Sequence, residues 1–232
     1  MAQEECLICK APLEYLNTSV EMECDICHKK VISKTRCVNG HFVCDDCHTA
    51  GIDQMIGTCL SVTSKNPIEI FQYFIHQPIC HMHGPEHHIL VGASLLCAYK
   101  NAGGKFDLYS ALLEMQKRGK QIPGGSCGFW GACGAAISSG IFISIVTQCT
   151  PLKETEWGMA NLMTSKSLES IGKIGGPRCC KRNSYLAIRE AVIFTEKHLG
   201  ISMEITPIQC THSAKNNQCI ALRCPFYINK CQ

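Results

Sequence analysis

The chain has 232 residues, and its 22 Lys and Arg against 19 Asp and Glu give a formal net charge of +3. This modest charge and an aromatic content of 7% argue against a zinc-finger protein that binds nucleic acid. The richest apolar run, residues 135–146, contains serines and falls short of the roughly 18–20 residues that cross a membrane, so we expect a soluble protein. The length suits a small module followed by one domain of about 170 residues.

Four evenly built pairs of metal-binding side chains occupy the N-terminal region. They are Cys6-x2-Cys9, Cys24-x2-Cys27, Cys37-x3-His41 and Cys44-x2-Cys47. A Cys-x-x-Cys turn presents two thiolates on one side, and two such turns complete the tetrahedral shell of one Zn²⁺ ion. The four pairs therefore predict two structural zinc ions in a zinc-ribbon or cross-brace-like module, residues 1–58, with short strands at the turns. We expect the metal to fold this module, because structural zinc contributes about 10–16 kcal/mol in finger peptides.

Disulfides are the alternative use of these cysteines, and they require an oxidising compartment. The N-terminal sequence MAQEECLICK has neither the basic nor the apolar region of a secretory signal. We therefore expect a cytoplasmic protein with reduced thiols. Of its nineteen cysteines, twelve lie outside the seven of the module, too many to be packing residues alone.

Residues 59–200 are predicted to form a helical domain. The segment NPIEIFQYFIHQ starts with Asn66-Pro67 and carries apolar residues at helical spacing. Further helices are predicted at about 85–101, 107–119, 131–148, 155–171 and 182–199, separated by Gly and Pro turns. After Gly200, ISMEITPIQC alternates like a strand, and a Cys-rich tail, 201–232, is expected to pack on the helices. The predicted fold class is mainly α, with the small zinc module before it and a short β/Cys-rich tail after it.

Thiol and imidazole groups cluster in Cys80-His-Met-His-Gly-Pro-Glu-His-His88, at the predicted start of a helix. Free N–H groups at a helix start favour anions such as a substrate carboxylate, and imidazoles beside them can transfer protons. Cys80, His81 and His83 are therefore candidate catalytic residues. A second metal site and ordinary structural histidines are the alternatives.

Two further segments are rich in chemical groups. In Pro123-Gly-Gly-Ser-Cys-Gly-Phe-Trp-Gly-Ala-Cys-Gly134, glycines let backbone N–H groups approach a ligand, and Cys127 and Cys133 lie where a low thiol pKa is expected. A tight helix crossing that needs small residues is the alternative. In Gly175–Asn183, we expect one of the adjacent cysteines to be a metal ligand. The cations Arg178, Lys181 and Arg182 would lower its pKa or hold a carboxylate.

These three segments, in this order, carry a resemblance. His81-x-x-Gly84-Pro85, Pro123-x-Gly-Ser-Cys-Gly128 and Cys179-x-x-Arg182-Asn183 resemble the Ser-His-x-x-Gly-Pro, Pro-Thr-x-Gly-Ser-x-Gly and Cys-x-x-Arg-Asn segments of the iron–sulfur-dependent L-serine dehydratases. The resemblance covers roughly residues 78–200 and extends to the related L-cysteine desulfidases. The whole chain also resembles uncharacterised cysteine-rich proteins of anaerobic bacteria and archaea.

The resemblance implies a [4Fe–4S] cluster held by three cysteines, with one iron free to bind the substrate's hydroxyl or thiol. It makes Cys179 a cluster ligand and His81 a substrate-site residue, and it assigns substrate binding to Gly125, Ser126, Arg182 and Asn183. A further cysteine of the dehydratases is replaced here by Leu168, so the ligation of the cluster must differ.

The tail supplies four more candidate metal ligands, Cys210, Cys219, Cys224 and Cys231. They suit an iron–sulfur cluster or zinc, although their spacing matches no standard ferredoxin run. Cys210 or Cys219 could instead complete a cluster begun by Cys127, Cys133 and Cys179, and the sequence leaves this choice open.

We therefore expect an oxygen-sensitive metalloprotein with two structural zinc ions and a [4Fe–4S] cluster. Its expected activity is lyase-type chemistry on a small hydroxy or thiol amino acid. The alternative is a non-enzymatic iron–sulfur carrier of sulfur or electrons, or a redox sensor, that docks a protein partner or redox donor through its zinc module. Neither hypothesis involves a membrane or a nucleic acid.

Overall fold

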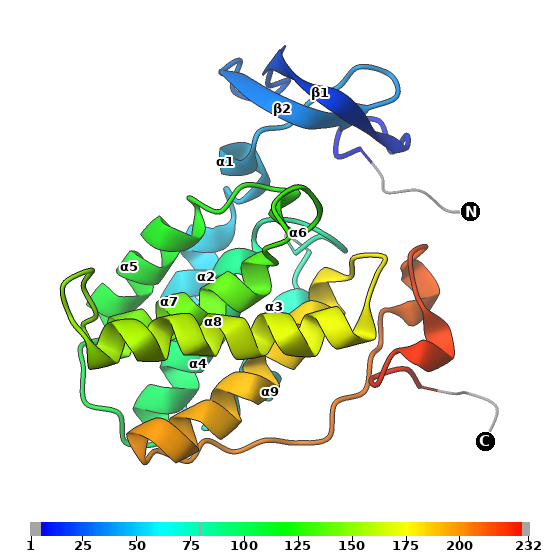
Figure 1. Ribbon diagram of the computed structural model, residues 1–232. Helices are drawn as coiled ribbons and strands as arrows, with labels where there is room; N and C mark the ends of the chain where they lie inside the picture. The colour runs from blue at the N-terminus through cyan, green and yellow to red at the C-terminus, as the bar shows by residue number, and fades with distance from the viewer. Residues whose placement is uncertain (1–5, 79, 229–232) are drawn as a thin grey trace.

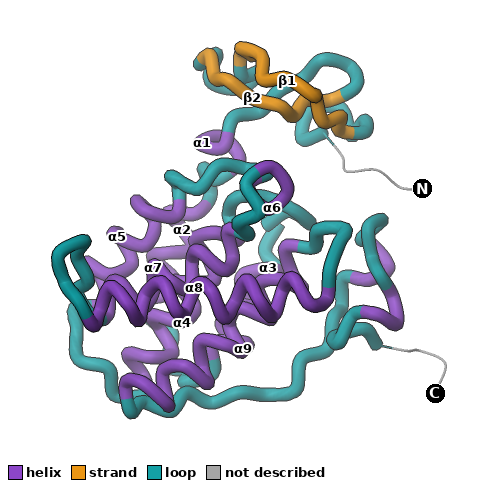
Figure 2. Tube along the Cα trace, viewed as in Figure 1, coloured by secondary structure: helices purple, strands orange, loops and turns teal. Residues whose placement is uncertain are grey.

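A computed structural model describes residues 6–78 and 80–228 of the chain. A small N-terminal module built on a two-stranded sheet lies over a bundle of helices, and the C-terminal segment lies against one end of that bundle (Figure 1). The helices and the sheet occupy separate parts of the molecule (Figure 2). The expectation of a mainly α fold with a small module before it is confirmed.

The sheet of the module pairs β1 (Leu13–Glu23) with β2 (Lys30–Cys37) in antiparallel register, for example Met22 opposite Val31. Beneath it, Met22, Cys24, Phe42 and Cys44 form a small buried cluster. Half of this cluster consists of candidate metal ligands, so apolar burial alone contributes little to the stability of the module.

The short helix α1 (Asp45–His48) leads out of the module. The bundle follows with α2 (Ile52–Cys59), α3 (Pro67–Ile75), α4 (His87–Asn101) and α5 (Leu108–Gly119), and after the short α6 (Ser126–Phe129) it is completed by α7 (Gly134–Val146), α8 (Thr155–Ile174) and α9 (Cys180–Leu199). Asn66 caps α3 by accepting a hydrogen bond from the Ile68 N–H group, and Pro67 fits the first helical position. Gly200, in the left-handed region, ends α9.

Helix α4 is the centre of the core, since every residue from His87 to Tyr99 is buried. Helix α7 packs against both α4 and α8. A Cβ atom on Gly140 would lie 1.9 Å from Thr164 Oγ1 of α8, and Ser138 Oγ accepts a hydrogen bond from the Gly92 N–H group of α4 at 2.9 Å. The small residues Ser138 and Gly140 of α7 therefore allow two close helix crossings.

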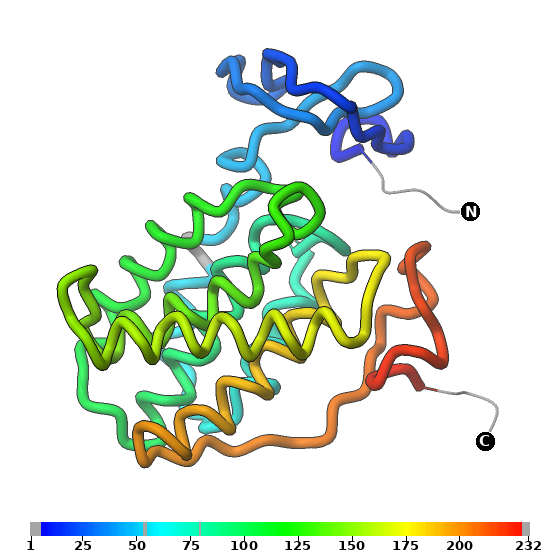
Figure 3. The backbone as a smooth tube through the Cα atoms, in the orientation of Figure 1, coloured from blue at the N-terminus to red at the C-terminus, as the bar shows by residue number. Residues whose placement is uncertain are grey.

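The strand predicted at residues 201–210 is wrong. This segment is extended but has no neighbouring strand, and it runs from the end of α9 along the bundle to the tail (Figure 3). Its contacts are single hydrogen bonds, such as Glu204 N–H to Lys65 O at 3.0 Å and one bridge between Cys210 and Tyr227. Two short 3₁₀ turns follow, Ser213–Lys215 and Ala221–Arg223.

None of the described helices combines the length and the apolarity that crossing a membrane requires.

Candidate functional site

The four ligand pairs of the module gather into two groups that could each hold a metal ion. Cys6, Cys9, Cys37 and His41 form one group, and Cys24, Cys27, Cys44 and Cys47 form the other. Within each group the ligand atoms lie within 4.8 Å of one another. The first pair thus joins the third and the second joins the fourth. This interleaved pairing is a cross-brace, whereas a zinc ribbon joins ligands in two successive halves.

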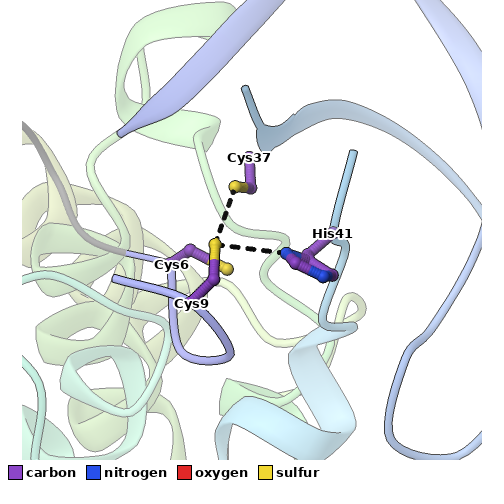
Figure 4. A group of neighbouring side chains, drawn as sticks. All are labelled: Cys6, Cys9, Cys37 and His41. Carbon is purple, nitrogen blue, oxygen red and sulfur yellow. Dashed lines mark hydrogen bonds between the residues drawn. The ribbon is translucent and has the colours of Figure 1, made fainter. Parts of the chain in front are cut away.

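The first group has the spacing of a tetrahedral site. Cys9 Sγ lies 3.4 Å from Cys37 Sγ and 3.2 Å from His41 Nδ1, with Cys6 beside them (Figure 4). Sulfur ligands at a Zn–S distance of about 2.3 Å lie roughly 3.8 Å apart, so a small outward movement would admit the ion. Hydrogen bonding, above all from the Ala11 N–H group, lowers the pKa of Cys9 to about 6, which favours the thiolate that binds metal.

The second group connects the sheet to the bundle. Cys27 Sγ lies 3.6 Å from Cys44 Sγ, and the Cys44 N–H group donates to Cys24 Sγ at 3.3 Å. Burial raises the pKa of Cys24, but backbone N–H groups outweigh it and bring the value to about 6. Cys47 lies within α1, so the last ligand pair of the module leads directly into the helices. None of the described cysteines forms a disulfide.

A cleft of about 1260 Å³ lies between the module and the bundle. Its walls include β2 and the segments 80–85, 123–130 and 178–181. The three segments that the sequence marked as rich in chemical groups therefore meet in one place, although they lie far apart along the chain.

Direct contacts hold the module on the glycine-rich loop. Asp45 Oδ2 accepts a hydrogen bond from the Gly124 N–H group at 2.8 Å. The rings of Tyr15 and Phe129 meet edge to face at 6.2 Å between centroids, and the guanidinium of Arg178 lies over Tyr15. The module, which carries both cysteine groups, is thus also one wall of the cleft.

The buried Lys181 ties the start of α9 to the 80–88 segment. Its ammonium donates to the carbonyl oxygens of His81 and Met82 and, at 3.2 Å, to His87 Nε2. His87 Nδ1 donates to Gly84 O, so the ring is neutral, and burial holds the pKa of His87 well below its usual range. Lys181 therefore has a structural role that its charge alone did not indicate.

Two of the predicted catalytic residues, Cys80 and His83, lie in surroundings that keep their side chains uncharged. Burial raises the pKa of Cys80 to about 12, which keeps it a thiol. His83 Nδ1 accepts a hydrogen bond from the Cys180 N–H group at 3.4 Å, and His83 Nε2 donates to Asn216 Oδ1 at 3.3 Å. Burial lowers the pKa of His83 to about 4, so its imidazole is neutral.

A second, smaller cavity brings Cys179 to the tail. It is lined by Cys179, Cys210, Cys219 and Cys224, together with Arg182, His212 and Asn216. Asn216 Nδ2 donates to Cys179 Sγ at 3.4 Å, so Asn216 links this cavity to His83 in the cleft. Cys127 lines the large cleft, and neither it nor Cys133 lines the small cavity. The predicted ligand Cys231 lies outside the described residues.

The predicted substrate-binding residues divide into two pairs. Gly125 and Ser126 line the cleft, and the buried Ser126 Oγ has no hydrogen-bond partner in the described part of the chain. The guanidinium of Arg182 donates to Gly175 O at 2.9 Å and Pro177 O at 2.8 Å. Asn183 Nδ2 donates to Cys133 Sγ. These contacts hold the turn before α9, and a substrate role for either pair stays a prediction.

Sequence reasoning missed two residues, His48, which lines the cleft, and Glu86, which is buried behind it. His48 ends α1, Glu86 precedes α4, and both lie beside His81. Burial raises the pKa of Glu86, but the imidazoles of His48 and His81 lower it by more, so the carboxyl is an anion. The available signals were the position of His48 directly after Cys47 and the place of Glu86 in a histidine-rich turn.

Comparison with known proteins identifies one family. Residues 55–227 match a family of unknown function, DUF5714. The chain belongs to the DUF5714 family. The matched region contains most of the bundle and the small four-cysteine cavity of this DUF5714 protein, and it excludes the two metal groups of the module. No curated protein and no solved structure matches the chain, and no match links it to the L-serine dehydratases or L-cysteine desulfidases.

Proposed function

We propose that this DUF5714 protein is a cytoplasmic metalloenzyme that carries out an elimination reaction on a small hydroxy- or thiol-bearing amino acid in the cleft. Two structural zinc ions hold the module that forms one wall, and an iron–sulfur cluster occupies the four-cysteine cavity. The observation that carries the proposal is the connection His83–Asn216–Cys179. It joins an imidazole in the cleft to a cysteine of that cavity.

The cysteines of the small cavity suit an iron–sulfur cluster. Cys179 Sγ accepts hydrogen bonds from the Arg182 N–H group and from Asn216, and Cys219 Sγ accepts one from Ala221 N–H. Such N–H donors stabilise cluster sulfurs and tune their potential. Burial raises the pKa of Cys179 to about 11 without metal, and coordination to a metal deprotonates a thiol outright. When bound, the cluster would supply a Lewis acid if one iron stays open, or an electron if none does.

The residues of the cleft have roles that do not depend on the cluster. Lys181 fixes the carbonyls of the 80–88 turn, and that turn presents His81 to the cleft. The hydroxyl of Ser126, buried and unpartnered among the described residues, is a hydrogen-bond donor available to a substrate carboxylate. Water exclusion by the docked module would strengthen each of these interactions.

A carrier or redox sensor is the second candidate, and one observation favours it. Four cysteines line the small cavity, and a cluster bound by four protein thiolates has no open iron. In that case the cluster would exchange electrons or sulfur with a partner, and the cleft would not bind an amino acid through iron.

Anaerobic purification with iron, zinc and sulfide analysis tests the cluster. Cys179→Ser and Cys219→Ser should lose iron, whereas Cys149→Ser, a matched control that lies outside the cavity, should retain it. If only Cys127→Ser and Cys133→Ser lose iron, the ligands of the cluster lie in the glycine-rich loop and not in the small cavity. Unchanged iron in every variant would reject the cluster.

Ligand response then separates the two functions. L-Serine or L-cysteine should change the EPR signal of the cluster and release pyruvate and ammonia, with sulfide from cysteine. Ser126→Ala should weaken turnover and retain iron. A reversible redox signal that responds to no amino acid, with no product, would reject the lyase in favour of the carrier.

A further inference from the structure

We infer that His48, His81 and Glu86 form a third metal site, for one divalent transition-metal ion bound by nitrogen and oxygen. This site is separate from the cysteine groups and rests neither on the proposed cluster nor on the proposed reaction. Each side chain offers one ligand atom, and these atoms all lie within 4.8 Å of one another.

The distances fit one ion at the centre of the group. Glu86 Oε2 lies 3.2 Å from His48 Nδ1, and Glu86 Oε1 lies 3.5 Å from His81 Nδ1. Nitrogen and oxygen ligands at about 2.0–2.1 Å from a tetrahedral Zn²⁺ ion lie roughly 3.3 Å apart. His48 and Glu86 Oε2 therefore have the spacing of two ligands of one ion, and His81 offers a third ligand atom within 4.8 Å of both.

The polar atoms of the group lack other partners. His48 Nδ1, His81 Nδ1 and Glu86 Oε2 are buried and make no hydrogen bond within the described residues, although the carboxylate side chain is only 2% exposed. The carboxylate is an anion with imidazoles around it, but its Oε2 atom accepts no hydrogen bond from the described residues. A bound cation would satisfy all three atoms at once.

The surrounding backbone holds the carboxylate in place. The His81 N–H group donates to Glu86 Oε1 at 2.9 Å, which leaves Oε2 directed to His48. A Cβ atom on Gly84 would lie 2.1 Å from Glu86 Oε2 and 2.5 Å from His48 Cε1. Glycine at this position is therefore what lets the imidazole and the carboxylate approach each other across the turn.

A simple His–Glu ion pair is the competing explanation of this geometry. An ion pair would be expected to align a ring N–H with a carboxylate oxygen, and at 3.2 Å His48 Nδ1 and Glu86 Oε2 are close without such alignment. A second imidazole, that of His81, also lies against the first, with ring centroids 4.3 Å apart. Two histidines and one carboxylate that converge on one point are a known ligand set for Zn²⁺ and Fe²⁺.

The ion would face the cleft, because His48 and His81 line it. Three protein ligands leave at least one coordination position open, as in catalytic sites, whereas structural zinc is fully coordinated by protein. The open position would take water or an oxygen of a small anionic ligand, such as a carboxylate. The cysteine groups of the module have four protein ligands each and lack this property.

Cobalt uptake by the intact, zinc-loaded protein tests the site. Wild type should bind one further equivalent of Co²⁺, with weak d–d absorption and no added sulfur-to-cobalt charge transfer, because no thiolate takes part. Glu86→Gln and His48→Ala should weaken cobalt binding by at least about 100-fold, since even outer partners of a ligand contribute about 10–100-fold. Competition by Zn²⁺ and by Fe²⁺ under argon then shows which ion the site prefers.

Matched controls separate loss of the site from loss of the fold. Glu69→Gln and His28→Ala change exposed residues of the same types and should bind cobalt as wild type does. Each variant must keep the zinc content and far-ultraviolet circular dichroism of wild type, and His48→Ala carries the test if Glu86→Gln does not fold. Equal cobalt binding in wild type and both site variants, or strong sulfur-to-cobalt bands in the added equivalent, would overturn the inference.

Discussion

Gly84→Ala should weaken metal binding at the third metal site in a protein that still folds. The new Cβ atom would lie 2.1 Å from Glu86 Oε2 and 2.5 Å from His48 Cε1, and the carboxylate oxygen must move by more than 1 Å to restore ordinary contact, which begins at 3.4 Å. The displaced atoms are the ends of two proposed ligands. The backbone around them is held by Lys181 and can remain in place.

The two expected effects, on folding and on metal affinity, are measured separately. Overpacking of a buried site costs about 1–3 kcal/mol of unfolding free energy. A displacement of about 1 Å in a positioned constellation costs on the order of 100-fold in its function, and we expect a similar loss of Co²⁺ affinity. With zinc in excess, the zinc content of the module should not change, because Gly84 touches none of its cysteines.

Gly158→Ala is the matched control. Gly158 lies within α8, and a Cβ atom there would meet nothing within 4 Å. This substitution should stabilise the protein by about 0.5–1 kcal/mol through helix propensity and leave cobalt binding unchanged. Cobalt titration and urea unfolding of both variants measure the comparison. Wild-type cobalt affinity in a folded Gly84→Ala protein would refute the reasoning, since the close approach of His48 to Glu86 would then be irrelevant to the site.

Three further outcomes are expected. A strong chelator should remove two zinc ions and unfold the sheet of the module while the bundle keeps its helical circular dichroism; a sheet that survives complete removal would show that metal does not fold it. Gly140→Ala should lower the unfolding free energy by about 1–3 kcal/mol, because the Cβ atom meets α8 at 1.9 Å; urea unfolding measures it, and stability equal to wild type would contradict the close crossing. Asn66→Ala should cost about 1 kcal/mol through the lost cap of α3, whereas the exposed Asn161→Ala should cost less than about 0.5 kcal/mol; equal melting temperatures would exclude a stabilising cap.

Structural features that depend on a few neighbouring residues could be predicted reliably from the sequence. The Cys-x-x-Cys turns are set by a few consecutive residues, so all eight members of the two candidate metal groups could be named, but the path of the hairpin decides which pairs meet. The Asn66-Pro67 pair correctly predicted the start of α3. The alternation in 201–210 predicted a strand wrongly, because a strand needs a neighbour and the described chain supplies none there.

Residues that meet across the fold could not be predicted. Cys179 shares a cavity with Cys210, Cys219 and Cys224 only because the extended segment after α9 returns the tail to the start of that helix. His48 lies next to the module in the sequence, but its side chain contacts Glu86 of the 80–88 turn. No spacing rule connects such residues, since their proximity follows from the packing of the bundle.

The adjacency of Cys47 and His48 has a consequence for the order in which the protein acquires its metals. Metal bound by the second cysteine group would fix Cys47, and His48 is the next residue along α1. If both sites bind metal as proposed, occupation of one raises the affinity of the other, because each fixes the same short helix. Loss of metal from the second cysteine group would then also weaken binding of the cleft ion, although none of the proposed ligands of that ion is a cysteine.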